Sequence, residues 1–442
     1  MSDFDLPQLE DLAAQALAEA QRLGAAEAEV SLSQGEGFSV TARMQEVETL
    51  EHHRDQGLSV SVYFDKRKGN ASTSDLSGAA ISETVAKACS MARFSAADDC
   101  AGLADPALLA QDYPDLSLYH PWEISVPAAI DLALAGEAAA LDVDKRITNS
   151  EGATVSVAEG AQVYANSLGF SGGYPDSYHS ISCSVLAGEG TEMQRDFEYT
   201  SSRNPTRLDA PVNVGREAGR RAVSRLGSRK LATTDAPVLF PARLARGLFG
   251  HFIGAISGGA LYRQASFLLD SLNTQVMADH ISIQEAPHIP AAPGSAPFDG
   301  EGVATGERML VADGVLQGYV LGSYSSRKLG MQSTGNAGGI HNLLVSHSDA
   351  GFDDLLTEMG TGLLVTELMG QGVNPVTGDY SRGAAGFWVE NGELQYPVHE
   401  ITIAGSLPEM LNNVVAVAND VDRRSTIQTG SLLLNKMTIA GS

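Results

Sequence analysis

The sequence predicts an α+β protein built from three parts. Near the N-terminus apolar residues recur at three- and four-residue steps, which is typical of an amphipathic helix, and alternating apolar and polar runs follow. In the last third, Asp-Gly and Asn-Gly pairs separate alternating runs, which indicates hairpins. A chain of 442 residues is expected to hold two or three domains. We predict an N-terminal α/β domain over 1–95, a linker and middle domain over 96–231, and a β-rich C-terminal domain over 232–442.

The N-terminal part has the pattern helix, strands, helix. Residues 9–23 carry a helical apolar stripe, and residues 28–33 and 58–64 alternate as strands do. The polar stretch 65–70 predicts a turn, and residues 81–92 predict a second helix. Together they predict a small α/β unit.

The middle part begins with a proline-containing connector over residues 95–121. An alanine-rich helix is predicted over 127–141, opened by Pro127. Residues 153–199 predict an antiparallel meander of short strands. Its strands are expected to be separated by Glu159-Gly160, Gly172-Gly173 and Glu189-Gly190.

The helix predicted over 212–230 is basic in an otherwise acidic chain. Its cationic residues are Arg216, Arg220, Arg221, Arg225, Arg229 and Lys230. We favour a solvated helix face that is stabilised by pairs such as Glu217 with Arg221. The alternative is a docking surface for an acidic partner or a peptide terminus.

Two hairpins are predicted in the C-terminal part. One joins 309–311 to 315–321 through Asp313-Gly314, and the other joins 387–390 to 393–396 through Asn391-Gly392. Both pairs suit the positive φ angles of a type I′ turn. Pro397 predicts that the second hairpin returns along a sheet edge or ends there.

The composition excludes several classes of function. Acidic residues outnumber basic ones by 54 to 29, so the net charge of −25 argues against nucleic acid and anionic membranes as partners. Three cysteines are too few for a disulfide framework. Residues 247–262 are too short and too glycine-rich for a spanning helix, and no signal peptide opens the sequence. A cytoplasmic location is expected.

Single motifs do not give a complete catalytic site. A zincin site needs two histidines one helical turn apart around a glutamate, but His399-Glu400 is the one His-Glu pair and it alternates as a strand. We give the other candidate histidines a low prior as ligands: His52, His53, His280, His288, His341 and His347.

Two further motifs lack the structural context that they need. Ser171 lies in a Gly-x-Ser-x-Gly match without the helix that a nucleophile elbow requires. Gly360-Thr361-Gly362 begins like a dinucleotide loop, but a strand is predicted after it.

The C-terminal third contains a set of ordered sequence blocks: residues 247–251, 257–259, 266–271, 324–330, 333–339, 359–362, 367–372, 378–383, 386–392 and 400–405. In these blocks the chain resembles the PmbA (TldE) branch of the TldD/PmbA family. Such a set is far more specific than any single short motif. The resemblance extends to essentially the whole chain, because the N-terminal element order also fits.

The resemblance implies a two-subunit cytoplasmic peptidase for unfolded or short polypeptides. In that family the TldD subunit holds zinc with His-Glu-x-x-x-His on a helix and a late cysteine. The equivalent helix should follow residues 238–240, with Pro241 opening it. His251 is the only histidine on it, and Phe252 stands where glutamate would be required. Residues 428–431 read Gln-Thr-Gly-Ser, without the cysteine.

The sequence therefore predicts a subunit with no catalytic and no metal-binding residues of its own, and zinc in a TldD-like partner. The expected partners are that catalytic subunit or a second copy, and a peptide substrate. A peptide-binding or chaperone-like homodimer without protease activity is the alternative. Hydrolysis through Ser171 is a third, weaker hypothesis.

Overall fold

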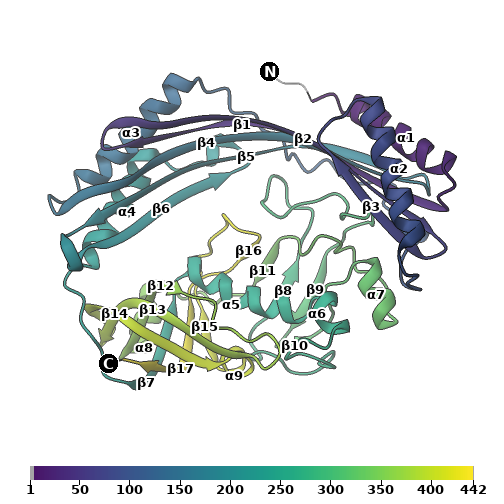
Figure 1. The fold of residues 1–442 in the computed structure, drawn as a ribbon. Helices are drawn as coiled ribbons and strands as arrows, with labels where there is room; N and C mark the ends of the chain where they lie inside the picture. Colours follow the sequence, from purple (N-terminus) through teal and green to yellow (C-terminus); the bar gives the residue numbers. More distant parts are fainter. Residues whose placement is uncertain (1–3, 442) are drawn as a thin grey trace.

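The computed structural model describes residues 4–441 as an arched sheet above a β-rich C-terminal domain (Figure 1). The arch contains α1 (Leu6–Arg22), β1 (Glu27–Arg43), β2 (Glu46–Phe64), β3 (Arg67–Thr73), α2 (Gly78–Phe94), α3 (Val126–Leu141), β4 (Ile147–Asn166), β5 (Ser171–Ala187), β6 (Gln194–Ser202) and α4 (Pro211–Ser224). Short 3₁₀ turns lie at Pro106–Leu108, Gly190–Glu192 and Pro205–Arg207. The α+β prediction is confirmed.

One antiparallel sheet runs through the whole arch, in the order β3-β2-β1-β4-β5-β6. Its central pairing joins β1 to β4 from Glu29 opposite Asn166 to Ala42 opposite Ala153. The sequence segments on the two sides of residue 95 thus contribute strands to the same sheet. The domain boundary near residue 95 stays a prediction.

The four helices cover the outer face of the arch (Figure 1). Helices α1 and α2 bury the alternate residues Val30, Leu32, Val60 and Val62, while α3 and α4 cover the other end of the sheet. Serines at the intervening positions, such as Ser31 and Ser33, face the concave side. The predicted helices and the alternation over 28–33 and 58–64 are confirmed.

Two of the predicted turns in the meander are wrong. Glu159-Gly160 lies inside β4 and Gly172-Gly173 inside β5, whereas the chain reverses between Asn166 and Ser171. A Cβ on Gly160 would lie 2.9 Å from the carbonyl oxygen of Gln34. Glycine is needed there for close contact between neighbouring strands, so it does not mark a turn.

Two other boundaries differ from the prediction. The turn after β2 is only Asp65-Lys66, with φ values of 47° and 66°, and β3 begins at Arg67. The basic helix α4 ends at Ser224 instead of continuing to 230, and Gly227 beyond it has a φ of 72°. Left-handed backbone of this kind is incompatible with a continuing helix.

The C-terminal domain contains two sheets and short helices. Its elements are β7 (Thr234–Phe240), α5 (Ala242–Ala255), α6 (Gly258–Tyr262), β8 (Ile283–Glu285), β9 (Arg308–Ala312), β10 (Val315–Leu316), α7 (Ser323–Leu329), β11 (Leu343–Val345), α8 (Phe352–Met359), β12 (Gly362–Met369), β13 (Asp379–Glu390), β14 (Glu393–Ser406), α9 (Leu407–Asn412), β15 (Val414–Val417), β16 (Ile427–Gln428) and β17 (Leu432–Ala440). One sheet has the order β14-β13-β12-β7-β17-β15 and closes through β14 with β17; the other has the order β10-β9-β8-β11-β16. The large hydrophobic core of the C-terminal domain lies between these two sheets and around α5.

Both predicted hairpin turns are confirmed, but β10 ends at Leu316, short of the predicted 321. Asp313 and Gly314 have φ values of 47° and 76°, and Asn391 and Gly392 have values of 53° and 77°, as type I′ turns require. Pro397 pairs with Phe387 of β13, and β14 continues past it to Ser406 and pairs with β17 over residues 402–404, so the hairpin neither ends at Pro397 nor returns along a free edge there.

Polar contacts hold both ends of the arch against the C-terminal domain. At one end Arg225 pairs with Glu367 of β12. At the other, Arg327 of α7 donates to the carbonyl oxygens of Cys100, Gly102 and Leu103 over 2.7–2.9 Å. The arch therefore spans the domain below it and encloses a space between its two supports.

No helix among residues 4–441 is both long and apolar enough to cross a membrane.

Candidate functional site

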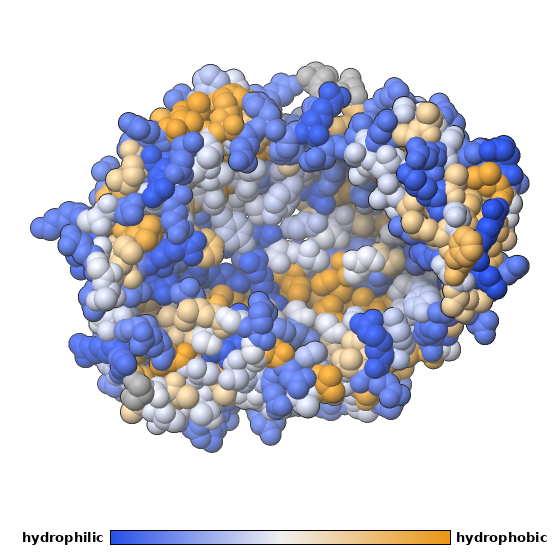
Figure 2. Space-filling model, viewed as in Figure 1, coloured by the Kyte–Doolittle hydropathy of each residue, from blue (hydrophilic) through white to orange (hydrophobic). Residues whose placement is uncertain are grey.

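A cavity of about 1080 Å³ lies between the concave face of the arch and the loops of the C-terminal domain. Figure 2 shows the molecule hollowed at this level. The arch contributes mainly hydroxyl side chains, among them Ser31, Ser33, Ser59, Ser72, Thr73 and Ser74. The opposite wall is formed by residues 293–300 and 337–341, which are rich in glycine and alanine. The cavity is thus lined by small polar side chains on the arch side and by small, mostly uncharged residues on the loop side.

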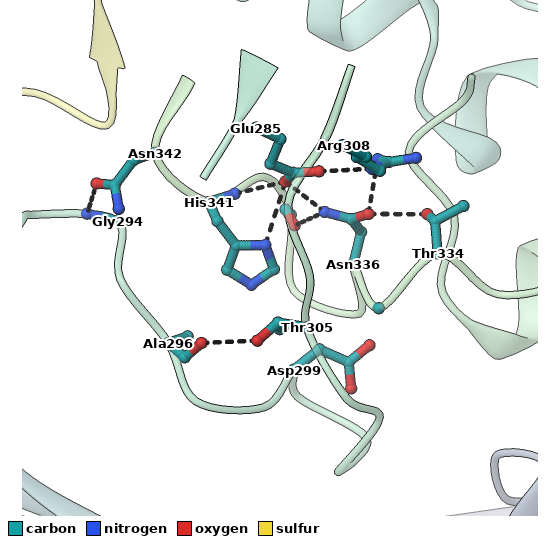
Figure 3. Close-up of polar contacts among 12 residues, drawn as sticks. Glu285, Gly294, Ala296, Asp299, Thr305, Arg308, Thr334, Asn336, His341 and Asn342 are labelled. Carbon is teal, nitrogen blue, oxygen red and sulfur yellow. Dashed lines mark hydrogen bonds and ion pairs between the residues drawn. The ribbon is translucent and has the colours of Figure 1, made fainter. Parts of the chain in front are cut away.

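A buried carboxylate organises the loop wall (Figure 3). Glu285, at the end of β8, is 1% exposed and accepts hydrogen bonds from the backbone and Nδ1 of His341 at 2.8 and 3.1 Å. Asn336 Nδ2 donates to the same oxygen at 2.7 Å, and Arg308 Nε donates to the other at 2.8 Å. Arg308 also donates to Asn336 Oδ1 at 2.8 Å. These contacts fix the 335–341 loop on the strand beneath it.

The charge of Glu285 is stabilised by this network. Burial alone would raise its pKa, but the hydrogen bonds from His341 and the positive charge of Arg308 outweigh burial and hold the pKa at about 2. Glu285 is therefore an ionised hydrogen-bond acceptor at neutral pH. Because it only accepts, Nδ1 of His341 carries the hydrogen of that contact.

The other ring nitrogen of His341 is directed away from Glu285. His341 is among the residues that line the cavity, and Figure 3 shows Nε2 on the side of the ring away from Glu285 and towards Thr305. An imidazole held by a carboxylate through Nδ1 presents Nε2 in a fixed direction. His341 can thus offer a hydrogen-bonding group to a bound molecule.

Asp299 is the second ionisable group at this wall. It is 4% exposed and accepts from the backbone nitrogens of Glu301, Val303 and Ala337 over 2.8–2.9 Å. Burial raises its pKa to about 6 in spite of these three donors, and the charge of Glu301 adds to the rise. Its contacts fix two loops, so a structural role explains its position.

The helix predicted after residues 238–240 is α5, and it follows β7 and Pro241 as predicted. His251 is half-buried, its ring packs edge-on against Tyr380, and burial lowers its pKa. Phe252 is 0% exposed in the core. Strand β16, where a late ligand would be expected, lies beside α5, and its Gln428 is buried. Among residues 4–441 no group of three His, Cys, Asp or Glu side chains is placed to hold a metal ion.

The remaining candidates do not form a catalytic site. Ser171 is exposed at the start of β5 and is followed by strand, so the nucleophile elbow is absent there. His399 lies in β14, and His52 and His53 are exposed neighbours on β2. His288 donates to or accepts from Thr305 at 2.9 Å. His280 and His347 lie outside the cavity wall. Gly360-Thr361-Gly362 leads into β12, a strand, as predicted.

The arginines of α4 mostly bind carboxylates of this chain. The predicted pair of Glu217 with Arg221 is present at 2.8 Å. Arg221 also reaches Glu198 at 2.5 Å, and Arg225 reaches Asp196 at 3.4 Å. Arg216, Arg220, Arg229 and Lys230 are exposed, as expected for a solvated face, whereas Arg221 and Arg225 pack against acidic residues of β6.

Sequence reasoning missed Glu285, Asp299 and Asn336. For Glu285 a signal was present: it follows Ile283 by two residues, so a strand places both side chains on the same buried face. A carboxylate at such a position needs buried partners. Asn336 lay within a recognised block, but nothing local indicated its contacts.

Comparison with known proteins identifies the family. The chain matches the PmbA/TldA metallopeptidase domain 1 over residues 28–92, the central domain over 119–226 and the C-terminal domain over 233–441. It is 53% identical to the metalloprotease PmbA of Escherichia coli O157:H7 over 414 residues, covering 94% of this chain and 92% of that protein. The chain belongs to the PmbA/TldE branch of the TldD/PmbA family.

A further relative matches the chain over most of its length, and two solved structures have a similar fold. The metalloprotease PmbA homolog of Haemophilus influenzae is 53% identical over 94% of this chain and 93% of its own. A solved structure from Bacteroides thetaiotaomicron has a TM-score of 0.94 at 30% identity, covering 98% and 99% of the two chains. TldE from Thermococcus kodakarensis has a TM-score of 0.84 at 20% identity, covering 97% and 100%. The PmbA/TldE fold is thus established for the whole described chain.

Proposed function

We propose that this PmbA/TldE-family chain is the non-catalytic subunit of a cytoplasmic TldD/TldE-type metalloprotease. It provides wall and volume for a cavity that admits unfolded or short polypeptides, and a TldD-like subunit provides the zinc. A homodimer that binds peptides without cleaving them is the alternative assembly.

The observation that carries the proposal is the environment of α5. A buried phenylalanine, Phe252, follows His251 where the catalytic subunit's glutamate would be needed. Without a second histidine and a carboxylate, this helix has nothing that would bind zinc and activate a water molecule. The cavity beneath the arch supports the peptide-holding part of the proposal.

The test combines metal analysis with a peptidase assay. The purified chain should contain no stoichiometric zinc and should not cleave an unfolded polypeptide. Addition of a TldD-like subunit from the same cell should give cleavage, and changing that subunit's motif glutamate to glutamine should abolish it. Zinc binding with cleavage by the lone chain would contradict the proposal. A stable homodimer that binds peptides and gains no activity with the second subunit would favour the alternative.

A further inference from the structure

The cavity walls are suited to main-chain recognition. Apart from tyrosines, Asp299 and His341 are the ionisable side chains among the lining residues that the structure describes. The volume of about 1080 Å³ slightly exceeds the range of about 300–1,000 Å³ that small-molecule sites occupy. Such a space, with few charges and many hydroxyls, fits an extended polypeptide better than a charged metabolite.

Strands β1, β2 and β4 cannot bind this polypeptide by accepting an added strand. The cavity-lining parts of β1, β2 and β4 are each paired with strands on both sides, so their backbone groups are already used. Peptide recognition through an added strand needs a free sheet edge. These three strands therefore offer side chains to the peptide, whereas the edge strand β3 and the loop wall have backbone groups left for main-chain contacts.

The loop wall has the open backbone that this requires. A Cβ on Gly338 or Gly339 would have no neighbour within 4 Å among the described residues, and both glycines are exposed. Their φ values of 101° and 126° are accessible chiefly to glycine. Glycine at these positions also lets another backbone come close.

His341 follows this glycine pair after one residue, and its imidazole is fixed from behind. Nδ1 is held by Glu285, which Arg308 and Asn336 hold in turn. Nε2 lies on the side of the ring away from Glu285 (Figure 3), and His341 is among the residues that line the cavity. A fixed polar atom costs little further ordering when a ligand binds it, which favours its use as a contact.

We propose that His341 is the residue of this chain that hydrogen-bonds the main chain of an extended peptide lying along Gly338 and Gly339. The proposal rests on the proposed function in taking a polypeptide as the ligand. It adds the position of that ligand and the side chain that binds it.

Matched substitutions test the roles of the two ring nitrogens of His341 separately. In His341→Asn the amide can keep the donor to Glu285, but the group at Nε2 is lost. In His341→Gln a polar group remains near the position of Nε2. His280→Asn serves as the control, because His280 is half exposed and outside the cavity wall. On the opposite wall, Ser33→Trp would fill the space, and Thr49→Trp places the same bulk on an exposed strand position elsewhere.

Binding is measured with the chain alone, by fluorescence anisotropy of a labelled, unstructured, uncharged peptide with blocked ends. Loss of one hydrogen bond should raise the Kd about three- to tenfold in His341→Asn. His341→Gln should stay closer to the parent, and Ser33→Trp should abolish binding. His280→Asn and Thr49→Trp should leave the Kd unchanged. Carbon-13 histidine spectra, assigned with His341→Gln, should show the His341 resonance shifting during the peptide titration.

Equal Kd values for the parent and His341→Asn, an unshifted His341 resonance, or tight binding by Ser33→Trp would overturn the inference. So would the absence of peptide binding by the parent chain. None of these measurements uses catalysis, so the two proposals can fail separately. An inactive assembly with His341-dependent binding refutes the proposed function alone, and an active assembly with unaffected binding refutes this one alone.

Discussion

At the scale of single residues, the molecule places two carboxylates with opposite pKa shifts on one wall. Glu285 is held ionised by His341, Arg308 and Asn336, whereas Asp299 is buried with only backbone donors around it. Each shift links folding to pH, because folding changes the affinity of the group for protons. The two carboxylates should therefore change the stability of the fold in different pH ranges.

For Glu285 we expect a loss of stability in acid. Its pKa falls from an ordinary 4.5 to about 2 on folding, so its contribution is present above about pH 4.5 and is lost as the pH falls toward 2. At about 1.4 kcal/mol per unit the contribution is about 3 kcal/mol. Urea unfolding of Glu285→Gln at pH 7 should show a loss of that order, with a smaller difference from the parent at pH 3. A difference that is the same at both pH values would contradict the assignment.

For Asp299 the sign is reversed. Its pKa rises from 3.8 to about 6 on folding, so the protonated form favours the folded state. Its contribution is fully present below about pH 4 and is lost as the pH rises through 6, by about 3 kcal/mol. The free energy of unfolding of Asp299→Asn should therefore depend less on pH between 4 and 7 than that of the parent. Equal slopes would show that Asp299 titrates normally.

The sequence alone could predict α5, its position after β7 and the residue on it, His251, since these follow from local pattern and from family resemblance. It could not predict the Glu285 network. Glu285, Arg308 and His341 lie far apart in the chain, and only the pairing of β8 with β9 and β11 brings them together. Local pattern carries no information on that pairing.

At the scale of elements, helices and hairpins were predictable because periodicity and turn chemistry are local. The misplaced turns at Gly160 and Gly172 have a common reason. A glycine inside a strand and a glycine in a turn look alike in sequence, and contacts with a neighbouring strand or a distant loop decide between them. Gly172 illustrates this, because a Cβ there would lie 2.8 Å from the hydroxyl oxygen of Tyr113.

The crossing of α3 and α4 depends on glycine in the same way. A Cβ on Gly215 would lie 1.8 Å from the carbonyl oxygen of Gly136, so the helices touch backbone to backbone. Gly215→Ala should lower the free energy of unfolding by about 1–3 kcal/mol or more, because the helices must separate. Gly247→Ala on α5 is the matched control: a Cβ there meets nothing within 4 Å and should stabilise by about 0.5–1 kcal/mol. Urea denaturation measures both, and equal effects would refute the close crossing.

At the scale of the whole molecule, the cavity depends on the arch being held at both ends. Arg327 donates hydrogen bonds from its three side-chain nitrogens to three carbonyl oxygens of residues 100–103. Next to it, Lys328 forms an ion pair with Asp98 at 2.9 Å. The other end is held by ion pairs of Arg225 with Glu367 and of Arg424 with Glu198. Nothing in the local sequence indicates either contact, since the partners are more than a hundred residues apart.

Removing the Arg327 contacts should loosen one support. In Arg327→Ala we expect faster hydrogen exchange over residues 98–110 and faster proteolysis in the 95–121 connector, because three backbone carbonyls lose their donor. Arg263→Ala is the control, since the contacts of Arg263 are with the neighbouring Tyr262 on the surface. Unchanged exchange in Arg327→Ala would show that other contacts hold this end.

The pairing of β1 with β4 also sets an order on synthesis of the chain. Glu29 finds its partner in Asn166 and Ala42 in Ala153, so the central ladder of the arch cannot form until the middle segment has left the ribosome. Until then β1, β2 and β3 can form a three-stranded sheet in which the edge of β1 stays open. In the C-terminal domain β7 pairs with β17, the last strand that the structure describes, so this pairing also forms late in synthesis. Neither half of the molecule can be completed early, and a nascent chain that stalls between them exposes two unfinished sheets to the cell's chaperones.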